Sequence, residues 1–138
     1  MIHAGGCHCG NLRYALDTAL ALEQLPLRAC QCSFCLHHGA RSTSDPTGRI
    51  HFEAKDAAQL TRYRFGLRTA DFLICAKCGI YVGATMVEDG RAYGIINANT
   101  LDEAAQLTQQ SQPMDYDGED ALARQSRRRA RWSPAQGP

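Results

Sequence analysis

The sequence predicts a mainly β domain with little helix, built around a zinc ion that four cysteines hold. Short segments with strand-like patterns recur between turn-forming residues, as in small all-β domains. Leu, Ile, Val and Phe together make up only 25 of the 138 residues, and the net charge is +1. A core this poor in large apolar side chains needs a further source of stability. Seven cysteines in three tight clusters could bind metal, and bound metal would supply that stability.

The expected strands are short and follow one another closely. They are expected at 13–16, 27–32, 50–52, 60–65, 69–74, 80–86 and 92–97. The first follows the first cysteine cluster, and Pro26 marks the start of the second. Residues 42–48 (STSDPTG) favour a turn before the third. Apolar and polar residues alternate with period two in the fourth strand and in much of the fifth.

Helix is expected only in short pieces. Residues 33–40 predict a helical turn, with Ser33 as a candidate N-cap and Gly39 near its end. Residues 101–107 are expected to form a second short helix, and the C-terminal segment is a candidate for a third. Between the last two strands, Glu88-Asp89-Gly90 predicts a hairpin turn.

We expect a zinc-binding domain at 1–108 and a polar, basic tail at 109–138 that packs on it or is partly flexible. A Gln-rich stretch at 109–112 separates the two. The tail ends in a run of arginines that could bind an anion, either a phosphate or a ligand carboxylate. Acidic residues just upstream offset much of this charge, so we expect a solvated helix end instead. The arginines are Arg124, Arg127, Arg128, Arg129 and Arg131.

Composition narrows the class of protein. No basic segment followed by an apolar one opens the chain, and no apolar run approaches the ~20 residues that span a bilayer. We therefore expect a soluble, cytoplasmic protein without a membrane partner. Cytosolic thiols stay reduced, so clustered cysteines there indicate metal ligands rather than disulfides. A pI of 7.6 gives no bias toward nucleic acid, which we do not expect as a partner.

Two cysteine pairs far apart in the chain predict one closed tetrahedral zinc site. Cys7 and Cys9 form the first pair, and Cys75 and Cys78 form the second. A glycine follows each pair, where a tight turn often needs positive φ. A metal shared by both pairs would clamp the first strands to a later hairpin, which is a structural role. The alternative is a set of free thiols.

The three remaining cysteines, Cys30, Cys32 and Cys35, predict a second zinc site that lacks one ligand. An open position admits water or a substrate thiol, and zinc deprotonates a bound thiol. That chemistry favours attack of sulfur on an aldehyde carbonyl, or the reverse cleavage. His38 is a candidate fourth ligand, which would close the site, or a proton carrier beside it. His37 and His38 could instead be solvated on an exposed turn.

The three clusters together resemble a known family, the glutathione-dependent formaldehyde-activating enzymes, whose domain the centromere protein V group shares. The resemblance covers about residues 5–102. It is carried by Gly6-Cys7-His8-Cys9-Gly10, Cys30-x-Cys32-x-x-Cys35 and Cys75-x-x-Cys78-Gly79. It implies an Mss4-like fold, which is an irregular β structure around a zinc ion.

The resemblance also implies roles for the cysteines. Those of the first and last clusters would hold a structural zinc, and Cys30, Cys32 and Cys35 a catalytic one. It further implies a carbon–sulfur lyase that joins glutathione and formaldehyde to S-hydroxymethylglutathione, or cleaves that adduct.

Our leading hypothesis is therefore an enzyme that forms or cleaves adducts between a thiol such as glutathione and a small aldehyde, with two zinc ions per chain. The main alternative is a zinc-stabilised binding module without turnover, and a metal-storage or redox-responsive protein is a third.

Overall fold

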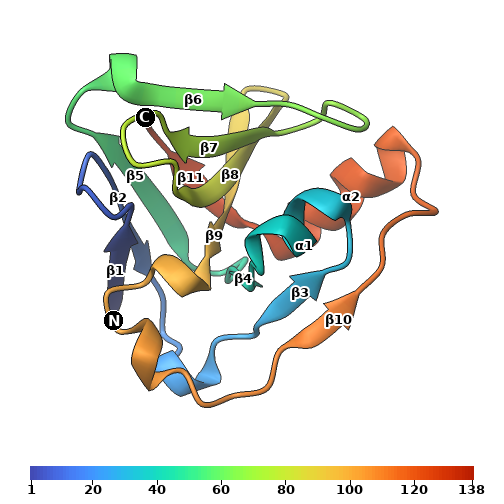
Figure 1. The fold of residues 1–138 in the computed structure, drawn as a ribbon. Coiled ribbons are helices and arrows are strands. Elements are labelled where there is room, and N and C mark those ends of the chain that lie inside the picture. The colour runs from blue at the N-terminus through green and yellow to red at the C-terminus, as the bar shows by residue number, and fades with distance from the viewer.

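Eleven strands form one branched sheet in the computed structural model, which describes residues 1–138 (Figure 1). Helix is confined to short elements, so the prediction of a mainly β fold is confirmed. The strands are β1 Ile2–Gly6, β2 Leu12–Asp17, β3 Arg28–Cys30, β4 Ser42–Thr43, β5 Arg49–Ala54, β6 Leu60–Tyr63, β7 Asp71–Cys75, β8 Tyr81–Glu88, β9 Arg91–Asn97, β10 Gln112–Met114 and β11 Ser133–Gln136. The α-helices are α1 Ser33–His38 and α2 Ala121–Arg131, and the 3₁₀ turns are η1 Leu22–Gln24, η2 Ala57–Gln59, η3 Ala98–Thr100 and η4 Ala104–Gln106.

The sheet branches at β9. One edge of β9 pairs with β8, which continues through β7 to β6. Its other edge pairs with β11 near Tyr93 and with β4 near Ile96. From β11 the sheet continues through β5 and β2 to β1, and from β4 it continues through β3 to β10. The last strand therefore joins two arms of the sheet (Figure 1).

The main core lies between these arms. In β2 the residues alternate between buried and partly exposed, because successive side chains of a strand point to opposite faces. Leu16 of β2, Ile50 of β5 and Ile96 of β9 are fully buried there. Cys7 and Cys75 belong to the same cluster, so the first metal-ligand candidates border the core.

A β-bulge in β8 determines which side chains of this strand point away from the main core. Tyr81 pairs with Ile74, but Gly83 pairs with the preceding residue Leu73, so Val82 is an extra residue. Because side chains alternate with period two, one extra residue moves the following register to the other face. Tyr81 consequently packs in a separate cluster with Cys35, away from the main core.

Several elements match the predictions, and others differ. The hairpin turn at 88–90 is confirmed, with positive φ at Asp89 and Gly90. Gly39 ends α1 in the left-handed conformation, but the N-cap is Cys32, whose sulfur accepts from the Cys35 N–H, and not Ser33. The helix expected at 101–107 is wrong, because the chain forms only the single 3₁₀ turn η4 there.

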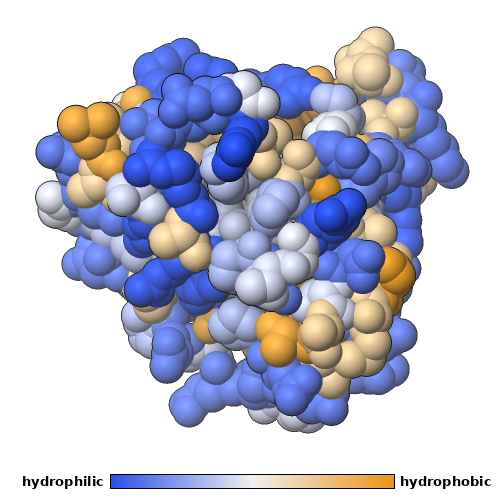
Figure 2. Space-filling view, turned by 180° about the vertical axis from the view of Figure 1, so that it is seen from behind, coloured by the Kyte–Doolittle hydropathy of each residue, from blue (hydrophilic) through white to orange (hydrophobic).

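The last thirty residues pass along two sides of the molecule. β10 runs parallel to β3, α2 follows, and β11 returns through the middle of the sheet (Figure 1). The helix proposed for this segment is therefore present as α2. Neither α-helix has the length and apolar character needed to cross a membrane. Seen from behind, the surface is mostly hydrophilic, with hydrophobic residues in small separate groups (Figure 2).

Candidate active site

Four cysteines from distant parts of the chain meet at one point. Cys7 and Cys9 lie after β1, Cys75 ends β7, and Cys78 lies in the turn before β8. Their sulfur atoms all lie within 4.8 Å of one another. The Cys7 and Cys9 sulfurs are 3.7 Å apart, and the Cys9 and Cys75 sulfurs are 3.5 Å apart. Four sulfurs arranged tetrahedrally at ~2.3 Å from zinc are ~3.8 Å from each other, so the cluster has the size of a zinc site.

Both pairs lie on turns that end at a glycine. Gly10 and Gly79 have φ values of 84° and 79°, a region that glycine enters without steric cost. The Gly79 N–H donates to the Cys75 carbonyl at 2.8 Å, and the Gly10 N–H donates to the Cys7 carbonyl at 3.2 Å. The expectation of positive φ after each pair is therefore confirmed. These turns aim the two sulfurs of each pair at a common point.

The protonation of this cluster is uneven. Burial raises the pKa of Cys75 to about 11. Burial also acts on Cys78, but hydrogen bonds from the backbone N–H groups of Cys9 and Ile80, and from the Cys75 and Cys7 side chains, together outweigh it and lower that pKa to about 6. Thiolates this close repel one another, so all four ionise together only when a cation lies between them. The donor set and its size therefore fit a divalent metal.

The three remaining cysteines form a second cluster at the start of α1. Cys30 ends β3, Cys32 caps the helix, and Cys35 lies in its first turn. Their sulfurs also lie within 4.8 Å of one another, and Cys35 is buried while the other two are half-buried. Side-chain hydrogen bonds from Cys30 and Cys35 stabilise the Cys32 thiolate and lower its pKa. Cys35 is the donor to Cys30 and Cys32, so its thiol holds its proton and its pKa is raised. One sulfur ionises at the expense of another, and a bound cation would remove that conflict.

The two histidines after this cluster are exposed, and neither ring belongs to it. His37 Nδ1 is 2.6 Å from the Ser33 carbonyl oxygen. The His38 ring packs against Phe34, with 4.6 Å between ring centroids, and lies 5.5 Å from the Tyr81 ring. The structure thus brings three sulfurs together and places His38 beside the aromatic residues.

Aromatic rings cover the second cluster on one side. Phe34, which lies between Cys32 and Cys35 in sequence, packs within 5.0 Å of the Phe65, Phe72 and Tyr81 rings, measured between centroids. Tyr81 is buried, which raises the pKa of its hydroxyl well above the usual value. Its hydroxyl is therefore protonated at neutral pH and can only act as a neutral hydrogen-bonding group.

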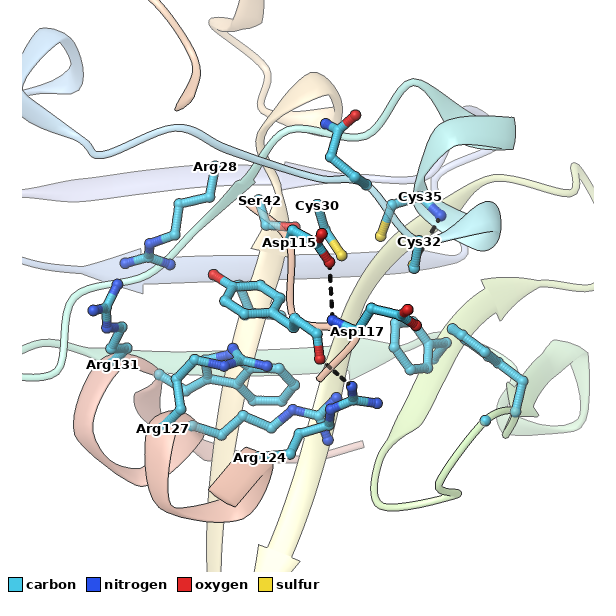
Figure 3. Close-up of a pocket in the computed structure, with 18 of the residues that line it drawn as sticks. Arg28, Cys30, Cys32, Cys35, Ser42, Asp115, Asp117, Arg124, Arg127 and Arg131 are labelled. Carbon is cyan, nitrogen blue, oxygen red and sulfur yellow. Dashed lines mark hydrogen bonds between the residues drawn. The ribbon is translucent and has the colours of Figure 1, made fainter. Parts of the chain in front are cut away.

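The second cluster opens on a cavity of about 560 Å³. Sulfur and aromatic side chains line one part of it, and side chains of β3 and of the C-terminal segment line the rest (Figure 3). A volume of this size fits a small organic ligand. The four-cysteine cluster does not border this cavity.

The expectation of a solvated helix end is wrong for three of the five C-terminal arginines: Arg124, Arg127 and Arg128 are half-buried or buried. Arg129 and Arg131 are exposed. Arg124, Arg127 and Arg131 lie across the cavity from the cysteines (Figure 3), and Arg128 also lines the cavity. Arg128 is only 7 % exposed, and its guanidinium lies 4.8 Å from the centre of the Trp132 ring. Trp132 is buried against β8 and β9. Its packing turns this face of α2 toward the cavity instead of toward water.

Sequence reasoning also missed residues that complete the cavity. Arg28 comes from β3, and Asp115, Tyr116 and Asp117 come from the loop after β10. The Tyr116 ring stacks under the Arg127 guanidinium at 3.4 Å. No motif marks these residues, because they meet only when β10 pairs with β3.

With this geometry in hand, the chain can be compared with known proteins. The family model of the glutathione-dependent formaldehyde-activating enzyme matches residues 2–115. The chain belongs to this family. A crystal structure of a protein from Rhodobacter sphaeroides is 31 % identical, covers 72 % of this chain and 87 % of its own, and superposes with a TM-score of 0.55. The family match includes every cysteine of both clusters but ends before α2.

Proposed function

We propose that the protein is a carbon–sulfur lyase-type enzyme that forms or cleaves adducts between glutathione, or a similar thiol, and formaldehyde or another small aldehyde. The observation that carries this proposal is the three-sulfur cluster on the wall of a cavity, in a chain of the formaldehyde-activating family. A metal site with three protein ligands keeps a position for an exchangeable ligand, as catalytic zinc sites do. We place the reaction in the cytoplasm, where thiols stay reduced.

Zinc is the metal in this proposal, with two ions per chain. Cys7, Cys9, Cys75 and Cys78 would hold the structural ion, and Cys30, Cys32 and Cys35 the second one. Sulfur donors without carboxylates favour zinc over magnesium or calcium. The separations of 3.5 and 3.7 Å between neighbouring sulfurs support a tetrahedral site of that size. Zinc in the second cluster would supply a Lewis acid that lowers the pKa of a thiol.

The reaction needs no oxidant or reductant. The sulfur of the thiol attacks the carbonyl carbon, a carbon–sulfur bond forms, and the carbonyl oxygen becomes a hydroxyl by taking up the proton that the thiol releases. Cleavage is the reverse. Phe34, Phe72 and Tyr81 form an aromatic wall beside the sulfurs, which keeps bulk water from that side. The Tyr81 hydroxyl is suited to donate a hydrogen bond to the oxygen of the adduct.

Exchange spectroscopy on glutathione and formaldehyde tests this proposal. The zinc-loaded protein is expected to accelerate interconversion of the free thiol and its adduct over buffer, because the second cluster activates the thiol. Cys30→Ser is expected to abolish the acceleration while the protein stays folded, since this residue lies outside the four-cysteine cluster.

Two results would contradict the proposal. One is a zinc-loaded protein that accelerates exchange for no thiol and no aldehyde. The other is a zinc X-ray absorption spectrum that shows both sulfur and imidazole ligands and does not change when glutathione is added. That result would favour a binding module whose second site is closed by His38.

A further inference from the structure

The cavity beside the second cluster has a cationic part formed by five arginines, three of which have no ion-pair partner within the chain. Two of its arginines, Arg124 and Arg127, share the carboxylate of Glu119. The other three have no carboxylate oxygen within 4.0 Å: they are Arg28, Arg128 and Arg131. Guanidinium groups that line a cavity and form no ion pair within the chain indicate a place for an anion.

Arg128 shows this most clearly because it is buried. Its Nη1 donates to the Thr69 hydroxyl at 2.7 Å, but its Nε has no hydrogen-bond partner. A buried charge without an opposite charge destabilises the folded protein. In agreement, burial, together with the charges of the nearby Arg127 and Arg124, lowers the pKa of Arg128 to about 10. An anion in the cavity would offset this cost.

Arg28 and Arg131 complete the cationic part from two different elements. Their guanidinium groups, from β3 and from the end of α2, point toward one another (Figure 3). Arg28 donates to the Ser44 hydroxyl at 3.1 Å. Like charges that face each other are unfavourable unless a ligand carries the opposite charge between them.

The cavity also holds two carboxylates, and these narrow the class of ligand. Asp115 and Asp117 line it without an ion pair to any of its arginines. Asp115 follows Met114, which pairs with Cys30, so this carboxylate comes from the part of the cavity near the sulfurs. Charges of both signs in one cavity favour a ligand with an ammonium group as well as a carboxylate over a simple inorganic anion.

From these observations we propose that Arg28, Arg128 and Arg131 form an anion-binding subsite that receives a carboxylate of the thiol co-substrate. The enzyme would then select a zwitterionic, amino-acid-like thiol by a group remote from the reacting sulfur. The identity of the ligand as a co-substrate rests on the proposed function. The subsite itself rests on the charge of the three arginines and on the burial of Arg128, while Arg28 is half-buried and Arg131 is exposed at the rim. Arg128 and Arg131 lie beyond the segment that matches the family.

A binding experiment that needs no turnover tests the subsite. The zinc-loaded full chain is titrated by calorimetry with S-methylglutathione, which keeps the carboxylates of glutathione but has no free thiol. Its diethyl ester and inorganic phosphate form two further arms. Arg131→Gln and Arg28→Gln are each expected to weaken binding of S-methylglutathione about tenfold or more, the scale of a lost charge-assisted hydrogen bond. Arg91→Gln, an exposed site outside the cavity, is the matched control and is expected to bind as the wild type does.

Each outcome is informative. Weaker binding of the ester than of the acid, with loss in both cavity variants only, supports the subsite. Equal binding of acid and ester, equal affinity in Arg91→Gln and Arg131→Gln, or binding of phosphate alone overturns it. Because thiol exchange is measured separately, intact binding without any exchange activity refutes the proposed function and leaves the subsite standing. If exchange of glutathione is unaffected in both cavity variants, the subsite is refuted and the proposed function stands.

Discussion

The cysteine side chains of this protein differ in how firmly the fold surrounds them. Cys7 and Cys75 belong to the main core, so their sulfurs are held by packing from both arms of the sheet. Cys30 and Cys32 are half-buried at the edge of a cavity. A rigid, core-bound site suits a structural ion, and a cavity-facing site suits ligand exchange. This difference in surroundings underlies the separate roles that we propose for the two clusters.

Serine substitutions in the two clusters are predicted to have different effects. Cys78→Ser should prevent stable folding, because a structural zinc site contributes about 10 kcal/mol or more, comparable with the whole stability of a small domain. Cys35→Ser should leave a folded protein with one zinc ion instead of two, since Cys35 is not a ligand of the four-cysteine site. Native mass spectrometry and thermal unfolding measure both properties. If the two variants lose the same amount of metal and stability, the division into structural and catalytic ions is wrong.

Among the elements of the fold, α2 is unusual because an arginine-rich helix lines a cavity. Its arginine-rich sequence would suit a solvated helix, yet it forms one wall of the cavity. Trp132 at its C-cap is buried, and Asp120 caps its N-terminus by accepting from the Ala123 N–H. Glu119, just before the helix, holds two of the cavity arginines in place. The helix is therefore positioned at both ends, and its cationic face is oriented as a consequence.

Glu119 predicts a pH dependence of stability. Hydrogen bonds from Arg127 hold its pKa below the usual 4.5, with Arg124 adding to the effect. A carboxyl with a depressed folded-state pKa stabilises the protein fully above its unfolded pKa, and this contribution is lost as the pH falls through the lower folded value. At pH 7 we expect Glu119→Gln to cost about 1 kcal/mol, allowing for solvent screening.

The difference between wild type and Glu119→Gln should shrink toward zero as the pH falls from about 5 through the depressed pKa of Glu119. Urea unfolding of both proteins over this range measures it, and loss of zinc at low pH affects both equally. A difference that stays constant across the range would show that Glu119 does not stabilise α2 through its charge.

For the whole molecule, the last strand connects the two arms of the sheet. Ser133 and Pro134 pair with β9, whereas Ala135 and Gln136 pair with β5. Ser133 is fully buried, and its hydroxyl accepts from the Asp45 N–H at 2.9 Å and donates to the Asp45 carbonyl at 2.7 Å. This pair of hydrogen bonds ties the end of the chain to the loop after β4. The C-terminal segment is thus part of the folded domain.

Removal of the Ser133 hydroxyl is predicted to weaken the whole fold. Ser133→Ala leaves a buried N–H and a buried carbonyl of Asp45 without that partner, which costs about 1–3 kcal/mol. Ser126→Ala, an exposed substitution on α2, should change the free energy of unfolding by less than about 0.5 kcal/mol. Chemical denaturation compares the two. Equal effects would mean that β11 is not integrated as the structure describes.

Local features of the chain were predictable because neighbouring residues create them. The spacing of Cys7 and Cys9, and of Cys75 and Cys78, with a glycine after each pair, requires a turn whatever the rest of the protein does. The turn at Asp89 and Gly90 follows the same logic. Strands with alternating side chains, such as β6 and β7, were also predictable in type and approximate place.

Elements without a local pattern were not predictable. β1 (IHAGG) and β11 (SPAQ) show no alternation that marks a strand. β1 forms because the next strand, β2, offers it an edge, and β11 forms because the distant strands β5 and β9 offer it theirs. Conversely, residues 101–107 have helical propensity, but the chain there follows the sheet and completes only one 3₁₀ turn. Tertiary pairing overrides propensity in short segments of this kind.

The sequence by itself determined the two sulfur clusters that can hold metal: the number, spacing and turn residues of the cysteines indicate them, because ligand geometry is mostly local. Only the tertiary structure decided which surface the second cluster faces. Arg28 and Arg131 are about a hundred positions apart in the chain, and an arginine run looks the same in sequence whether it points to water or to a cavity. The burial of Trp132 and the pairing of β10 with β3 are non-local contacts, and they turn the arginines toward the sulfurs.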